Sequence, residues 1–177
     1  RVAEQFLLTR DEWDADQAAI LDRVANEVGY PCLIKSPCQG SSIGMAIPKD
    51  EAHFKKSLLD VFMYGDLVMV EKFVKGTEVT CAVLDVEDGK SPRALPVIEI
   101  CPVDSEFFDY HAKYTPGACN EIVPARISAE ATKKVQAVAE RVHHVIGCSG
   151  FSRSDMILDG DDPVWIEINT IPGMTET

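Results

Sequence analysis

The sequence has few basic residues and no long apolar segment. Lys and Arg number 17 against 29 Asp and Glu, so the formal net charge is −12, which argues against a general nucleic-acid-binding protein. No apolar run approaches the roughly 20 residues that a membrane span requires, and the first thirty residues hold no apolar block typical of a signal peptide. We therefore expect a cytoplasmic protein that binds neither nucleic acid nor membrane.

The sequence also lacks the cysteine and histidine spacings of metal-binding and redox motifs. The six cysteines include no C-x-x-C pair, and no histidine stands at zinc-ligand spacing, so neither a structural zinc site nor a redox pair is predicted. No internal repeat or low-complexity segment is present. Of the 177 residues 46% are hydrophobic, which is enough to bury a real core.

The order of expected elements predicts two α+β lobes with a boundary near Gly76, one at residues 1–76 and one at 77–177. In the first lobe we expect strands at 6–8, 31–35, 43–47 and 67–71, with a helix that ends at Gly29 and a second that Asp50 caps. In the second lobe we expect strands at 78–84 and 94–100.

A long helix capped by Ser128 is expected next. Its apolar stripe is predicted to be Ala131, Val135, Val138, Val142 and Val145. His143 and His144 lie beside this stripe, so we expect both at the surface or half buried.

Two loops draw attention by their composition. Ser36–Gly44 reads SPCQGSSIG, and glycine there lets backbone N–H groups approach a phosphate. It lacks the G-K-[ST] ending of a Walker loop, and a simple hairpin tip has the same composition. The segment Cys101–Pro124 shows no sustained period but clusters aromatic residues beside Lys113, which is typical of a mobile lid.

The stretch Ser149–Gly173 predicts an antiparallel hairpin. Val164, Ile166 and Ile168 alternate with Trp165, Glu167 and Asn169, so one face is expected to be apolar and the other polar. If the loop holds three residues, Asp155 opposes Glu167 and Arg153 opposes Asn169. Directly opposed side chains lie roughly 5 Å apart at Cβ, and this set fits a divalent metal with phosphate. The alternative is a solvated strand face with a chance salt bridge.

These segments together resemble, in order and spacing, the ATP-grasp core of D-alanine–D-alanine ligase. The motifs that carry the resemblance are KSPCQGSSIGM, VEKFVKGTEVTCAVL, FFDYHAKY, GFSRSDMIL and WIEINTIPGMT. The resemblance implies an α+β fold in which two lobes with mainly antiparallel sheets clasp ATP. Two positions depart from the family pattern, since Ser36 precedes Pro37 and Gln39 replaces a commonly acidic residue.

The resemblance also implies a role for each matching position. The implied nucleotide ligands are Lys35, Gly40, Ser41, Ser42, Gly44, Glu71, Lys72, Phe73, Val74, Glu78 and Lys113. The implied metal ligands for Mg²⁺ or Mn²⁺ are Asp155, Glu167 and Asn169. The implied catalytic residues are Ser41, Lys113, Tyr114, Arg153 and Gly173.

The implied reaction is the ATP-dependent ligation of two D-alanines through an acyl phosphate, for peptidoglycan synthesis. We expect this chain to be the catalytic core of a longer protein, truncated at both ends, inactive alone, and dimeric through an N-terminal domain that it lacks. Two alternatives stay open: a ligase that joins D-alanine to D-lactate or D-serine, and a non-catalytic nucleotide-binding module. Tyr114 favours D-alanine, because the lid tyrosine is typical of that branch.

Overall fold

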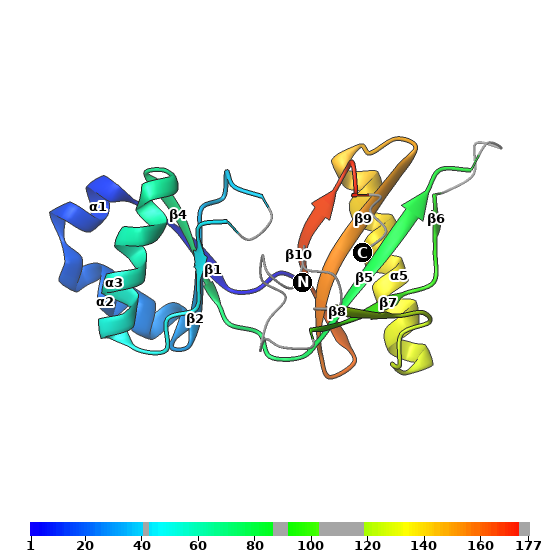
Figure 1. Ribbon diagram of the computed structural model, residues 1–177, viewed down its shortest axis with the longest axis horizontal. Helices are drawn as coiled ribbons and strands as arrows, with labels where there is room; N and C mark the ends of the chain where they lie inside the picture. The colour runs from blue at the N-terminus through cyan, green and yellow to red at the C-terminus, as the bar shows by residue number, and fades with distance from the viewer. Residues whose placement is uncertain (41–42, 87–91, 103–118, 174–177) are drawn as a thin grey trace. The chain divides into compact units, whose positions relative to one another are not determined.

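The computed structural model describes residues 1–40, 43–86, 92–102 and 119–173, which divide into two compact units. The N-terminal unit is Ala3–Phe73, and the C-terminal unit is Val74–Thr177 together with Arg1–Val2. Each unit combines a sheet of antiparallel pairs with helices (Figure 1), as the α+β prediction requires. The functional lobes predicted at 1–76 and 77–177 stay a prediction.

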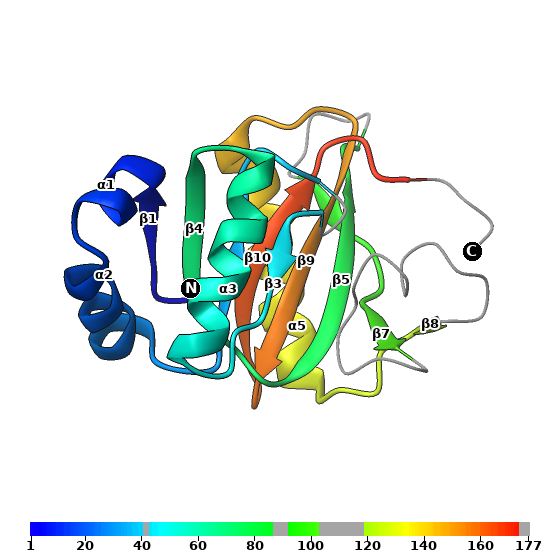
Figure 2. The same ribbon diagram turned by 60° about the vertical axis from the view of Figure 1, so that its left-hand side comes forward.

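The N-terminal unit has a four-stranded sheet in the order β1-β4-β2-β3. Its strands are β1 (Gln5–Thr9), β2 (Cys32–Lys35), β3 (Met45–Ala46) and β4 (Leu67–Lys72). Its helices are α1 (Arg10–Ala15), α2 (Gln17–Arg23), the π-helical turn η1 (Val24–Val28), α3 (Glu51–Val61) and the 3₁₀ turn η2 (Phe62–Tyr64). The helices lie together on one side of the sheet in Figure 1, and Figure 2 shows the same unit turned by 60°.

The core of this unit follows from alternation along the strands. Cys32 and Ile34 of β2 are fully buried against Phe54 and Leu58 of α3, while the residues between them point to the other face. Asp50 caps α3 as predicted, since its carboxylate accepts from the His53 N–H at 2.8 Å. The predicted strand at 43–47 is wrong in extent, because only β3 pairs there.

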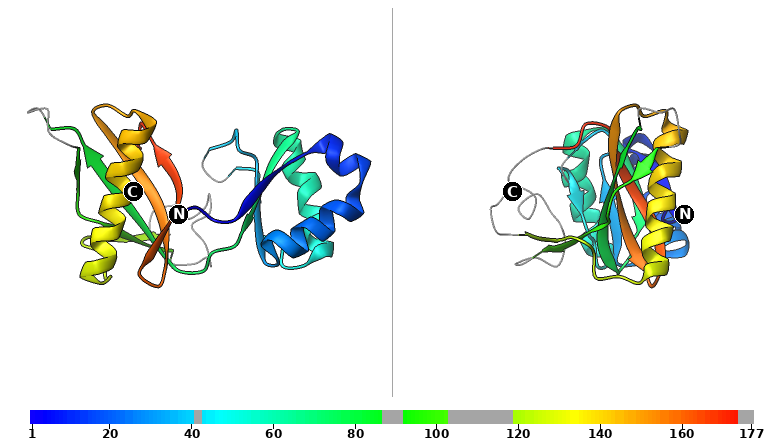
Figure 3. Two further views of the ribbon diagram at one scale, coloured as in Figure 1. Left: turned by 180° about the vertical axis from the view of Figure 1, so that it is seen from behind. Right: turned by 90° about the vertical axis from the view of Figure 1, so that its right-hand side faces the viewer.

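The C-terminal unit has a sheet in the order β10-β9-β5-β7-β8, with β6 paired to β5. Its strands are β5 (Thr77–Leu84), β6 (Arg93–Ala94), β7 (Ile98–Pro102), β8 (Cys119–Ile122), β9 (Phe151–Asp159) and β10 (Asp162–Asn169). The long helix α5 (Ala129–Ile146) packs on one face of this sheet (Figure 3).

Two predictions for this unit need correction. The strand predicted at 94–100 is divided into β6 and β7, because each pairs with a different part of β5. The segment Cys101–Pro124, predicted to lack regular structure, contains β8, which pairs with β7. The lid predicted within that segment falls mainly on residues 103–118, outside the described residues. Along the described chain, no helix combines the length and apolarity needed to cross a bilayer.

The buried stripe of α5 differs from the predicted one. Ala131, Val135, Ala139 and His143 are buried at strict four-residue spacing, whereas Val145 is 73% exposed. His143 is therefore buried, and the prediction that it is at the surface or half buried was wrong, whereas His144 is exposed as predicted. The physical reason is that both ring nitrogens have partners: Nδ1 lies 2.8 Å from Ser152 Oγ and Nε2 lies 3.2 Å from Asp85 Oδ1.

The first prediction concerns Gly76, which begins the approach to β5. A Cβ at this position would lie 1.9 Å from the backbone oxygen of Leu158. Backbone atoms of a paired strand cannot move aside, so we expect Gly76→Ala to destabilise the C-terminal unit by about 2 kcal/mol or more. Thermal unfolding measures this. Gly40→Ala is the control, because no atom lies within 4 Å of its added Cβ, and equal melting temperatures for both variants would contradict the prediction.

The second prediction concerns Glu99 of β7, whose side chain is 9% exposed. Hydrogen bonds from Arg126 lower its pKa from 4.5 to about 2. A lowered pKa in the fold means that the stabilisation is present above pH 4.5 and is lost as the pH falls towards 2. We expect Glu99→Gln to lower the free energy of unfolding by about 1–3 kcal/mol at neutral pH. Its free energy of unfolding should also fall less than that of the wild type as the pH is lowered from 4.5 to 2.

Melting temperatures at a series of pH values measure this loss. Glu130→Gln is the matched control, because Glu130 forms an exposed ion pair with Lys134 on α5, and such a pair contributes roughly 0.3–0.5 kcal/mol. A Glu99→Gln profile that parallels the wild-type profile between pH 4.5 and 2 would show that the Glu99–Arg126 contact does not govern acid stability.

Candidate functional site

The hairpin of β9 and β10 has the predicted pairing of site residues, but its turn and one of its strands differ from the prediction. Its turn has two residues, not three, because Asp159 pairs with Asp162. A β-bulge between Trp165 and Glu167 then adds one residue to β10. As a result Glu167 opposes Asp155 and Asn169 opposes Arg153, as the sequence predicted.

The bulge also changes which face each residue of β10 occupies. Trp165 opposes Met156, which lies in the core beneath α5, and Trp165 itself packs against that core. The prediction that Trp165 shares a face with Glu167 was therefore wrong, since one extra residue reverses the alternation.

The other face of the sheet gathers most of the site residues predicted in this unit. Register places Thr80 opposite Asp155 and Glu78 opposite Ile157 on the neighbouring strand β5. We call this face the site face. Its charged and polar residues include Glu78, Thr80, Arg153, Asp155, Glu167 and Asn169, and Glu121 of β8, which opposes Ile100 on the same face.

Asp155 is the centre of the hydrogen bonds on the site face. Its Oδ1 accepts from Thr80 Oγ1 at 2.6 Å and from Arg153 Nε at 3.0 Å. Its Oδ2 accepts from Arg153 Nη2 at 3.2 Å and from Asn169 Nδ2 at 3.0 Å. Thr80 was not predicted as a functional residue, because a threonine in a strand is ordinary and only the register reveals its partner.

Arg153 is partly buried but stays positively charged, because its pKa is raised. Burial acts to lower the pKa of Arg153, but its hydrogen bonds to Asp155 and the nearby carboxylates of Glu167 and Glu121 outweigh that effect, and the pKa is raised. The guanidinium therefore remains a fixed positive charge between carboxylates.

The donor set fits a hard divalent cation. Asp155 and Glu167 supply carboxylate oxygens from directly opposed positions, and Asn169, whose amide nitrogen faces Asp155, retains a carbonyl oxygen for a metal. No cluster of three or more His, Cys, Asp or Glu side chains suited to a metal occurs among the residues described; the present set has two acids, and its third member is an amide.

In the N-terminal unit, Lys35 and Glu71 form a partly buried ion pair. Their charged groups lie 2.5 Å apart, with side chains 25% and 14% exposed. Glu71 opposes Leu33 in the β2–β4 pairing, so both charged residues lie on the sheet face away from the helices. The structure thus brings these two predicted residues together.

Lys72 is placed differently. As the next residue of β4 it points to the opposite side from Glu71, and its ammonium lies 2.8 Å from Glu4 Oε2 at an exposed position. Phe73 ends the N-terminal unit and Val74 begins the other. Gly173 is exposed at the end of the described residues. The nucleotide-binding and catalytic roles given to these four residues stay predictions.

The glycine-rich loop Ser36–Gly44 is closed by a hydrogen bond from the Ser36 N–H to the Gly44 oxygen at 3.1 Å. Gly44 has φ +66°, and a Cβ there would lie 2.8 Å from the Tyr64 ring. Only glycine meets both conditions. Gly40 has open space around it, and Cys38 is exposed.

Four predicted site residues lie outside the described residues. These are Ser41, Ser42, Lys113 and Tyr114. Their predicted roles in phosphate binding and in the lid stay predictions.

A serine, a histidine and an aspartate meet at one end of α5, but they form no catalytic site. Ser152 and His143 are 0% and 1% exposed, so no substrate can reach the hydroxyl. The Gly150 N–H donates to Asp85 at 2.6 Å, and this bond together with the His143 contact lowers the pKa of Asp85. The group joins the end of β5 to α5 and β9.

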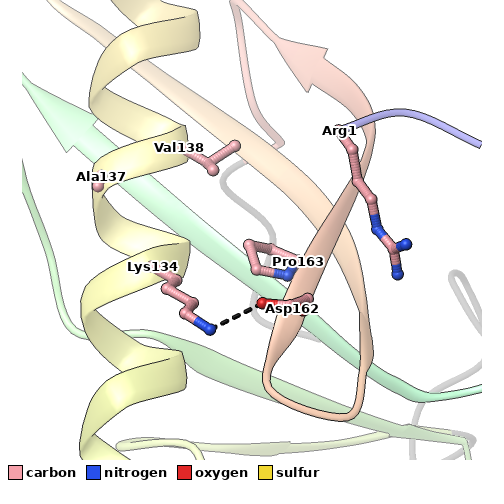
Figure 4. Close-up of a pocket in the computed structure, with 6 residues that line it drawn as sticks. All are labelled: Arg1, Lys134, Ala137, Val138, Asp162 and Pro163. Carbon is pink, nitrogen blue, oxygen red and sulfur yellow. Dashed lines mark hydrogen bonds and ion pairs between the residues drawn. The ribbon is translucent and has the colours of Figure 1, made fainter.

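An open depression of about 390 Å³ lies beside α5, on the side of the sheet away from the site face (Figure 4). Its lining residues are Arg1, Lys134, Ala137, Val138, Asp162 and Pro163. Lys134 is 2.7 Å from Asp162, and Arg1 is 2.5 Å from Asp159. The charged groups of the depression are thus paired within the protein, and none of the predicted site residues that the structure describes lines it.

Comparisons with known proteins show the family to which the chain belongs. The family model described as the D-ala D-ala ligase C-terminus matches residues 1–177. The D-alanine–D-alanine ligase of Halalkalibacterium halodurans is 41% identical over 180 residues, covering 100% of this chain and 56% of the relative. That of Syntrophobacter fumaroxidans is 44% identical over 158 residues, covering 89% and 50%. The chain spans about half the length of these curated relatives.

Two solved structures carry the same fold and the same family name or a closely related one. A D-Ala:D-Ser ligase from Enterococcus faecalis has a TM-score of 0.78 and 36% identity, covering 98% of this chain and 49% of that one. A D-alanine–D-alanine ligase from Bacillus anthracis, complexed with ATP, has a TM-score of 0.72 and 32% identity, covering 99% and 52%. The chain therefore belongs to the D-alanine–D-alanine ligase C-terminal family and has its ATP-grasp fold.

Proposed function

We propose that the protein containing this chain ligates two D-alanines with ATP, to make a peptidoglycan precursor. The γ-phosphoryl group passes to the carboxylate of one D-alanine, giving an acyl phosphate and ADP. The amine of a second D-alanine then attacks the acyl carbon and loses a proton, and phosphate leaves. Family membership and the chemistry of the site face support this proposal.

One observation carries the proposal: a cation and two opposed carboxylates share one sheet face. Arg153 and Asp155 are hydrogen-bonded on β9, and Glu167 stands opposite Asp155 on β10. Phosphoryl transfer depends mainly on positioning and charge stabilisation. We assign Arg153 to the charge on the transferring phosphoryl group and the tetrahedral intermediate, with the Gly173 N–H as a second donor.

We propose that Asp155, Glu167 and Asn169 hold Mg²⁺ or Mn²⁺. The cation supplies positive charge to the phosphate oxygens when bound. The Arg153 guanidinium lies against the Asp155 carboxylate; with a cation held there, it would turn to the transferring group, the role that we assign to it.

The N-terminal unit supplies the proposed nucleotide ligands. Lys35 ends β2 beside the glycine-rich loop and is held by Glu71, so its ammonium is oriented before phosphate arrives. The proposed phosphate ligands are Lys35, Gly40, Ser41, Ser42, Gly44, Lys72 and Lys113. Of these, Lys72 would have to leave its ion pair with Glu4 on the other side of β4. We assign Glu71, Phe73 and Val74 to adenine and Glu78 to the ribose hydroxyls. Lys113 and Tyr114 belong to the proposed lid, which would protect the acyl phosphate from water.

A second candidate is the ligation of D-alanine to D-serine, because the chain resembles a D-Ala:D-Ser ligase as well. The predicted lid tyrosine, Tyr114, favours D-alanine. We further propose that the protein is cytoplasmic, as a homodimer, with ATP and D-alanine as its small-molecule partners; the net charge of −12 does not suit nucleic acid.

The third prediction tests the activity. We expect the full-length protein, given Mg-ATP, to release ADP only when D-alanine is added and to form a dipeptide of two D-alanines, measured by mass spectrometry. D-serine and D-lactate at neutral pH are the competing second substrates. Formation of the mixed product instead would favour the second candidate, and Mg-ATP binding without D-alanine-dependent ADP release would identify a non-catalytic module.

The fourth prediction concerns Arg153. We expect Arg153→Ala to retain nucleotide binding, since the proposed adenine and phosphate ligands remain, and to lose ligation by about 10³-fold or more, because a phosphoryl-stabilising cation is removed. Isothermal titration measures binding, and the coupled ADP assay measures turnover.

Arg141→Ala is the matched control, because Arg141 is exposed on α5, on the far side of the sheet. We expect it to behave as wild type. Near-normal turnover by Arg153→Ala would refute the role assigned to the guanidinium.

A further inference from the structure

Three side chains donate hydrogen bonds to the carboxylate of Asp155, and they differ in what else they do. Arg153 and Asn169 are themselves assigned to the reaction, one to the phosphoryl group and the other to the metal. Thr80 has no such role. Its hydroxyl is 2.6 Å from Asp155 Oδ1, the shortest of the four bonds to this carboxylate.

We infer that Thr80 is a positioning residue that holds the Asp155 carboxylate in the orientation that receives the divalent cation. The inference rests on the proposed function, because it takes Asp155 to be a metal ligand. Thr80 touches neither metal nor substrate in this role. It acts through Asp155 alone.

The backbone makes Thr80 a rigid support. Thr80 and Asp155 are directly opposite in the β5–β9 pairing, in the interior of a sheet that continues to β7 on one side and β10 on the other. Thr80 is 6% exposed, and a β-branched side chain on a strand has restricted χ1 rotation. Arg153 is a longer side chain, 32% exposed, and can turn away without disturbing the sheet.

The pattern of bonds distinguishes the two oxygens of Asp155. Oδ1 is held by Thr80 and Arg153, whereas Oδ2 is held by Arg153 and Asn169. If Arg153 turned to the phosphoryl group, Oδ2 would keep only the Asn169 amide, and it would lose that donor too if the amide turned towards the cation, whereas Oδ1 would keep the Thr80 hydroxyl. Oδ1 is then the anchored oxygen, and Oδ2 is the oxygen presented to the cation.

A purely structural role would be that Asp155 satisfies a buried hydroxyl. The backbone oxygen of Ser154 lies 3.2 Å from Thr80 Oγ1 and could accept the same hydrogen. A hydroxyl has one hydrogen to donate, and the shorter bond to a charged acceptor is the stronger one. The two roles differ in their consequences: a positioning role affects metal affinity, and a structural role affects only stability.

The fifth prediction measures that affinity in the full-length protein. Mn²⁺ is titrated with a non-hydrolysable ATP analogue present, and unbound Mn²⁺ is followed by electron paramagnetic resonance. Loss of a residue that orients a metal ligand typically costs 10–100-fold in metal affinity. We expect Thr80→Val, which keeps the shape but not the donor, to weaken Mn²⁺ binding by about 10-fold or more.

Two further variants isolate the hydroxyl. Thr80→Ser keeps the donor, and we expect it to bind Mn²⁺ within about 3-fold of wild type, a small part of the loss that a missing orienting bond causes. Thr132→Val is the matched control: it also removes a threonine hydroxyl bonded to a backbone oxygen, at 2.9 Å in α5, and we expect unchanged affinity.

The outcomes separate this inference from the proposed function. If wild type binds Mn²⁺ and Thr80→Val binds it equally well, the positioning role is wrong while the metal site stands. If wild type binds no Mn²⁺ in the presence of the analogue, the metal site itself fails. If Thr80→Val does not fold, Thr80→Ala is compared with Thr80→Ser, which differ only in the hydroxyl; equal affinities would overturn the inference.

Discussion

A single extra residue in β10 decides what the hairpin presents on each face. Side chains alternate along a strand, so the register set at the turn would carry Glu167 to the position opposite Ser154, on the face that α5 covers. The bulge between Trp165 and Glu167 shifts the pairing by one residue and sets Glu167 opposite Asp155. Trp165 stays packed against the core, and both acids reach the same face.

Two opposed carboxylates repel, so this face needs compensating groups. Arg153 provides a charge whose raised pKa keeps it ionised, and Thr80 and Asn169 add neutral donors to Asp155. The N-terminal unit follows the same plan, with the Lys35–Glu71 ion pair on the sheet face away from the helices. In the N-terminal unit one face of the sheet forms the core with several helices, and in the C-terminal unit with α5, which leaves the other face of each sheet for chemistry.

Local features were predictable because their causes lie within a few residues. Asp50 and Ser128 cap helices through their own side chains, and Gly147 ends α5 in the left-handed conformation. The grouping of Asp155 with Glu167 was also predicted, but from a three-residue loop, and it was correct because a shorter turn and a bulge together give the same pairing. A bulge leaves no sign in residue type when the added residue is an ordinary isoleucine such as Ile166.

The sequence by itself determined the alternation, the caps and the residue types of the site, since these depend on neighbouring positions and on side-chain chemistry. The tertiary structure decided which distant partners met. His143 is buried because Ser152 and Asp85 supply partners for its ring, and Thr80 faces Asp155 because β5 pairs with β9 in one particular register. Hydrogen bonds between residues some 75 positions apart follow from strand pairing, and no local pattern specifies that pairing.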